Sequence, residues 1–79
     1  MNEGRVLVVD DDPQILRAVR TSLQGHSYDV VTAGNGETAL DLLPDADVDL
    51  IVLDLGLPGI GGHEVIRRVR SKLEVWAAL

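Results

Sequence analysis

Two short runs of consecutive apolar residues constrain the fold of this chain more than any other feature. Residues 6–9 read Val-Leu-Val-Val and end at Asp10, and residues 50–53 read Leu-Ile-Val-Leu and end at Asp54. Unbroken apolar runs of this length, with β-branched residues, are typical of strands that are buried on both faces, as in a parallel sheet. Residues 28–32 give a further expected strand between them.

Helix signals separate these strands. Asp12 is a suitable N-cap and Pro13 suits the first helical position, so we expect a helix that begins at Pro13 and stops at Gly25. A shorter helix is expected over residues 37–43, with Pro44 and the acidic residues after it breaking the helix.

The last expected helix begins near Gly62 or His63. Its apolar stripe follows helical spacing and comprises Val65, Ile66, Val69, Leu73 and Trp76. Residues 72–79 are compatible with either a longer helix or a distorted fourth strand. The resulting β-α-β-α-β-α order predicts an α/β fold of three layers, with a parallel sheet and right-handed crossovers.

Composition excludes several classes of protein. The 79 residues make one domain at most, and the absence of cysteine excludes disulfides and thiolate metal sites. Acidic residues outnumber basic ones 13 to 7, a net charge of −6 that argues against nucleic-acid binding by this segment. No apolar run reaches the length of a membrane span, and the N-terminus lacks a secretion signal, so we expect a cytoplasmic protein.

Three carboxylates follow the apolar runs. Asp10 and Asp11 lie at the carboxyl end of the first strand, and Asp54 lies at the carboxyl end of the third. If the strand order is 2-1-3, these side chains converge where the chain order reverses. Carboxylates at close range repel one another, and a hard, oxygen-seeking cation such as Mg²⁺ relieves that repulsion. An aspartate beside such an ion can act as a nucleophile toward phosphorus. The competing interpretation of the first cluster is a solvated loop with a helix cap.

The motifs resemble those of a known family. They are residues 6–13 (VLVVDDDP), residues 28–30 with 33–40 (YDV, AGNGETAL) and residues 49–58 (DLIVLDLGLP). With these motifs in this order, the chain resembles the receiver domain of bacterial two-component response regulators, whose CheY-like, flavodoxin-like fold has the strand order 2-1-3. The sequence of residues 54–58 (DLGLP) is most similar to that of receivers of winged-helix (OmpR/PhoB-type) transcriptional regulators.

The resemblance implies a role for each matching residue. Asp54 would accept a phosphoryl group from a sensor histidine kinase, which makes the chain a phosphoacceptor signalling domain rather than an enzyme. Asp11 and Asp54 would bind Mg²⁺ directly, Asp10 would do so through water, and Gly56 would offer its backbone carbonyl. In a full-length regulator this phosphorelay would control transcription.

The chain also departs from the family pattern. Pro58 and Gly62 would shape the loop beside the acceptor, although Gly61 stands where the family commonly has an aspartate. Residues 1–79 would form a partial receiver, without the final strands and helices that carry the family's phosphate-sensing Ser/Thr and its Lys.

Two other functions compete with this interpretation. Without the Ser/Thr and Lys, the chain is compatible with a non-catalytic receiver remnant that binds a partner protein. An aspartate-based magnesium hydrolase is disfavoured, because such enzymes usually carry a second aspartate where Gly56 stands. Without a fourth strand, residues 50–53 would also form an exposed apolar edge, where we expect self-association.

Overall fold

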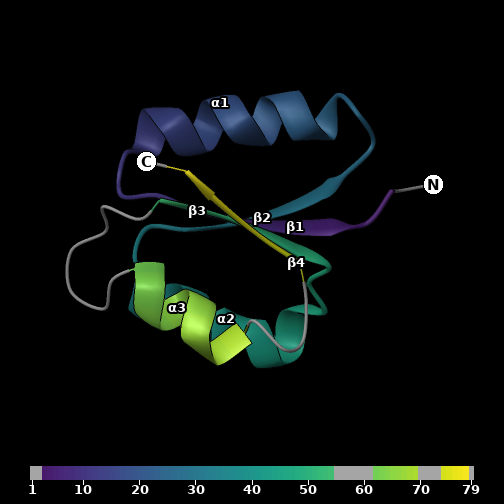
Figure 1. The fold of residues 1–79 in the computed structure, drawn as a ribbon. Helices are drawn as coiled ribbons and strands as arrows, with labels where there is room; N and C mark the ends of the chain where they lie inside the picture. The colour runs from purple at the N-terminus through teal and green to yellow at the C-terminus, as the bar shows by residue number, and fades with distance from the viewer. Residues whose placement is uncertain (1–2, 55–61, 70–73, 79) are drawn as a thin grey trace.

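The computed structural model describes residues 3–54, 62–69 and 74–78. Strands and helices alternate in the order β1, α1, β2, α2, β3, α3, β4 (Figure 1). Their bounds are β1 Arg5–Val9, α1 Pro13–Gln24, β2 Asp29–Ala33, α2 Gly36–Ala46, β3 Leu50–Asp54, α3 Gly62–Val69 and β4 Glu74–Ala78.

The four strands form one parallel sheet in the order β2-β1-β3-β4. This arrangement confirms the predicted 2-1-3 order and adds a fourth strand. The chain crosses from β1 to β2 in one direction along the sheet and from β2 past β1 to β3 in the other. Right-handed crossovers in opposite directions place their helices on opposite faces. Accordingly, α1 covers one face and α2 and α3 cover the other (Figure 1).

The apolar runs divide between the two faces because successive side chains of a strand point in opposite directions. One half of the core lies under α2 and α3 and includes Leu7, Ile51 and Val65, each with 0% of its surface exposed. The other half lies under α1, where buried Val6 and Val8 meet half-buried residues of the helix. Burial on both sides explains why these strands are apolar at every position rather than at alternate positions.

Local capping fixes the first two helices. Asp12 is the N-cap of α1, and its Oδ1 accepts a hydrogen bond of 2.9 Å from the Gln14 N–H. Asn35 caps α2 in the same way, accepting from the Thr38 N–H at 2.7 Å. The helix α1 ends at the predicted place, with Gly25 as its C-cap.

The predicted end of the second helix is wrong. The helix α2 does not stop at residue 43 but passes through Pro44 to Ala46, where Asp47 adopts the left-handed conformation with φ 53°. Proline removes only one backbone donor, and the helix ends two residues later, so the disruption stays within its last turn.

At the end of the chain, the helical stripe predicted to reach Trp76 was wrong, whereas the alternative of a fourth strand within residues 72–79 is confirmed. The helix α3 ends at Val69, and Trp76 belongs to β4 instead of the helical stripe. Strand β4 pairs with β3 along residues 50–54, so β3 is not an edge strand. Because β4 covers this edge, the structure gives no support to the expected self-association through β3. No helix in the described ranges has both the length and the apolarity to cross a bilayer.

Candidate functional site

Three consecutive aspartates follow β1, and the structure gives each a different position. The Asp10 N–H donates to the Ala33 carbonyl at 3.2 Å, which extends the pairing of β1 with β2 by one residue. The Asp10 carboxylate is half-buried, and its Oδ1 accepts a hydrogen bond of 2.9 Å from the Asp12 N–H. Asp12 itself is occupied as the cap of α1. Asp11 lies between them with an exposed side chain and makes no hydrogen bond or ion pair with any other described residue.

Asp54 reaches the same place from β3. In the register of β1 with β3, Val9 lies opposite Leu53, so Asp10 and Asp54, which follow them, lie next to each other at the carboxyl ends of the two strands. One carboxylate oxygen from each of Asp10, Asp11 and Asp54 lies within 4.8 Å of the others. The structure thus brings together the three acidic residues that the sequence singled out; we refer to them as the aspartate pocket.

The donor set of the aspartate pocket suits a hard divalent cation. All three candidate ligands are carboxylate oxygens, and the exposure of Asp11 leaves room for water. Mg²⁺ prefers one or two carboxylates together with waters, whereas zinc sites use His and Cys. The chain has no cysteine, and the His26 ring is placed elsewhere, with Nδ1 2.9 Å from the Ser22 carbonyl. Three negative charges at this separation attract a cation by simple electrostatics.

Of the three other residues predicted for the site, only Gly62 lies within the described part of the chain. Gly56 and Pro58 lie outside the described residues, so their expected roles stay predictions. Gly62 is the first residue of α3. Asp49, which precedes β3, makes a structural contact: its Oδ2 accepts a hydrogen bond of 2.8 Å from the Arg5 N–H.

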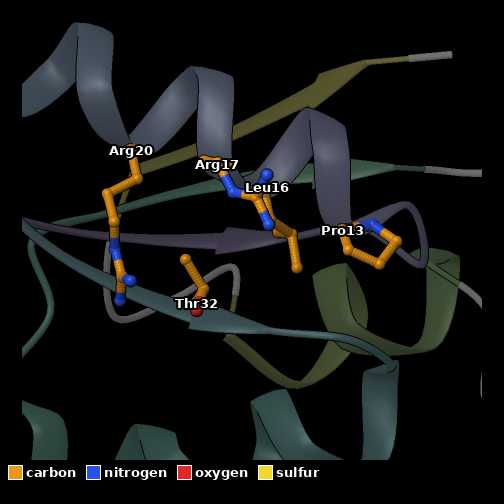
Figure 2. A pocket seen from close by; sticks show the side chains of 5 residues that line it. All are labelled: Pro13, Leu16, Arg17, Arg20 and Thr32. Atoms are coloured by element: carbon orange, nitrogen blue, oxygen red, sulfur yellow. The ribbon is translucent and has the colours of Figure 1, made fainter.

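The sequence reasoning missed a concave surface that lies between α1 and β2. It has a volume of about 240 Å³ and is lined by Pro13, Leu16, Arg17, Arg20 and Thr32 (Figure 2). The available signal was a pair of arginines three residues apart on α1, together with a threonine between apolar residues of β2.

Comparison with known proteins identifies the family. The profile of the response regulator receiver domain matches residues 6–77. This chain belongs to that family. The receiver resembles the transcriptional regulatory protein KdpE of Mycobacterium tuberculosis, with 46% identity over 68 residues, which is 86% of this chain and 30% of KdpE. It is 44% identical to the transcriptional regulatory protein ResD of Bacillus subtilis over 71 residues, covering 90% of this chain and 30% of ResD.

Solved receiver structures share the fold. The response regulator TrrA of Thermotoga maritima, in complex with Mg²⁺ and BeF, superposes with a TM-score of 0.85 and 40% identity over 95% of this chain and 66% of TrrA. The N-terminal domain of a receiver protein from Methanoculleus marisnigri gives a TM-score of 0.89 and 30% identity, covering 96% of this chain and 66% of that one. The receiver spans about 30% of the length of the curated regulators that it matches.

Proposed function

We propose that this receiver accepts a phosphoryl group on Asp54 from a sensor histidine kinase, with Mg²⁺ bound at the aspartate pocket. The convergence of three carboxylates within 4.8 Å at the ends of β1 and β3 carries this proposal. The solved complex of TrrA with Mg²⁺ and BeF supports it, because that relative of 40% identity binds both. Asp10 and Asp11 would hold the ion together with Asp54 and the Gly56 carbonyl, and Pro58 and Gly62 would shape the adjoining loop.

Each aspartate has a distinct task in the proposed reaction. A carboxylate oxygen of Asp54 attacks phosphorus, a new O–P bond forms, and the P–N bond to the kinase histidine breaks, so the imidazole leaves with the bonding electrons. A bound Mg²⁺ supplies charge neutralisation for the phosphoryl oxygens. The Asp12 N–H holds the Asp10 carboxylate at 2.9 Å, which keeps it oriented toward the pocket while Asp12 anchors α1. Such transfers depend on positioning more than on acid–base groups.

The output of this receiver is proposed from its relatives. KdpE and ResD are transcriptional regulatory proteins, and the receiver matches 30% of each. We infer that in a full-length regulator, phosphorylation of Asp54 controls transcription through parts of the protein other than this segment.

A non-catalytic interaction module is the second candidate, and strand β4 is the observation that favours it. Its residues are Glu-Val-Trp-Ala-Ala, so no Ser, Thr or Lys stands on the strand next to Asp54. A receiver without a phosphate-sensing hydroxyl at this strand would bind a partner without responding to phosphorylation.

Intact mass spectrometry after incubation with Mg²⁺ and acetyl phosphate separates the two candidates. The wild-type protein should gain one phosphoryl group, and Asp54→Asn should gain none. Asp41→Asn, which removes an exposed aspartate of α2, is the matched control and should be modified like the wild type. Chelation of Mg²⁺ should abolish the adduct. A folded wild-type sample that shows no adduct would support the interaction module, and equal labelling of Asp54→Asn would place the acceptor elsewhere.

A further inference from the structure

The concave surface between α1 and β2, which we call the α1–β2 hollow, is lined by basic, hydroxyl-bearing and apolar side chains. Two guanidinium groups and one hydroxyl surround it, and Leu16 and Pro13 supply its apolar part. Figure 2 shows the Arg20 side chain extending from α1 toward β2, where Thr32 lies. Its volume of about 240 Å³ is somewhat below the ~300 Å³ at which small-molecule sites usually begin, so it suits a compact ligand.

The position of Thr32 follows from the alternation of β2. Val30 is buried in the half of the core under α1, and Thr32, two residues later, lies on the same face of the strand. In the register of β1 with β2 it stands opposite Val8, which is 2% exposed. Thr32 therefore places a hydroxyl group, where a valine would place a methyl group, at a half-buried position that borders the hollow.

The charges around the α1–β2 hollow are unbalanced. The helix α1 contains Arg17 and Arg20 but no acidic residue. Neither arginine makes an ion pair or hydrogen bond with another described residue. Like charges three residues apart on a helix repel. This cationic pair stands in a chain whose net charge is −6, so it is a local exception to the overall charge.

The other arginines in the described part of the chain are all paired with a carboxylate. Arg5 Nε lies 2.7 Å from an Asp29 carboxylate oxygen, and Arg67 and Arg68 both pair with Glu64. The two arginines of the α1–β2 hollow thus differ from the other described arginines in having donors available to a ligand.

We propose that the α1–β2 hollow binds a compact oxyanion with two negative charges, either a phosphate monoester or a small dicarboxylate. Guanidinium groups match the geometry of both, since each presents parallel N–H donors to two oxygens. The Thr32 hydroxyl would donate a further hydrogen bond, and Leu16 would contact the carbon skeleton. The proposal does not depend on phosphorylation of Asp54, because neither β3 nor any residue of the aspartate pocket lines this hollow.

Nuclear magnetic resonance titration at pH 7 and constant ionic strength tests the proposal, with inorganic phosphate and malonate as the two probes. Saturable shifts are expected at the Arg17 and Arg20 side-chain Nε–H groups and at the Thr32 amide. A stronger response to phosphate would assign phosphate monoesters, and a stronger response to malonate would assign dicarboxylates. Arg17→Gln/Arg20→Gln should weaken binding by about tenfold or more, since charged hydrogen bonds are lost.

The matched control is Arg67→Gln/Arg68→Gln, which removes the same two charges from α3 and should bind both probes like the wild type. Arg20→Gln alone, at an exposed position, provides a second variant if the double variant does not fold. Shifts that rise linearly without saturation, or that persist unchanged in the Arg17/Arg20 variants, would overturn the proposal. Binding of an oligoglutamate peptide without any response to phosphate or malonate would also overturn it, in favour of a protein-docking surface.

Discussion

Replacing Asp11 by asparagine removes one negative charge from the aspartate pocket with almost no change of shape. The Asp11 side chain is exposed and makes no hydrogen bond or ion pair with other described residues, so the substitution removes repulsion without breaking a contact. Its carboxylate oxygen lies within 4.8 Å of those of Asp10 and Asp54. We therefore expect Asp11→Asn to be more stable than the wild type when no divalent cation is present.

The size of this effect follows from Coulomb's law. Two unit charges at this distance repel by about 0.9 kcal/mol in a medium with the dielectric constant of water. At 0.1 M salt, where the Debye length is about 10 Å, each repulsion falls by about a third. Asp10 adjoins Asp11 in the sequence and repels it in the unfolded chain as well, so mainly the repulsion from Asp54 is lost on unfolding, and the free energy of unfolding should rise by about 0.5 kcal/mol. At 1 M salt the Debye length is about 3 Å, and most of this gain should disappear.

Urea denaturation with a chelator, at 0.1 M and 1 M sodium chloride, measures the effect. Asp41→Asn removes an exposed carboxylate outside the aspartate pocket and corrects for the change in net charge. Adding Mg²⁺ should reverse the order, because a ligand present at 100 times its Kd stabilises the wild type by about 2.7 kcal/mol and the variant has lost one ligand. If Asp11→Asn proves no more stable than Asp41→Asn at 0.1 M salt, the three carboxylates do not repel one another as the structure requires.

Two further predictions test the core and the helix α3. Ile51→Ala should lower the free energy of unfolding by about 2–5 kcal/mol, because Ile51 is fully buried; Ile15→Ala, at a position 45% exposed, should change it far less, and similar urea midpoints for both would contradict the assigned core. Hydrogen bonds from Arg67 and then Arg68 lower the pKa of Glu64 below its ordinary value of 4.5. The ion pairs should therefore contribute stability above pH 4.5 and lose it as the pH falls through the lowered pKa. Carboxyl-carbon resonances followed across this range should show the lowered pKa of Glu64 in the wild type and a return toward 4.5 in Arg67→Gln/Arg68→Gln.

Local signals in the sequence were enough to predict the strands and the helix start that carry the aspartate pocket. The apolar runs at residues 6–9 and 50–53 are strands because burial on both faces demands apolar side chains at every position. The start of α1 was equally predictable, since Asp12 and Pro13 satisfy the requirements of a helix N-terminus without help from the rest of the fold. The candidate residues at positions 10, 11 and 54 follow from their places directly after these strands.

Only the tertiary structure decided which secondary structure the chain adopts at residues 74–78. The spacing of apolar residues up to Trp76 suits a helix, yet residues 74–78 form β4, because pairing with β3 satisfies backbone groups along an otherwise open edge. The α1–β2 hollow likewise depends on α1 packing over Thr32, which no spacing within either element reveals. Convergence of Asp54 with Asp10 and Asp11 depended on β1 and β3 being neighbours. Strand order is a non-local property, because it is set by packing between segments more than 40 residues apart. Residue patterns therefore predicted the strands and the aspartates that follow them, and the tertiary structure determined which strands are neighbours and which aspartates lie close together.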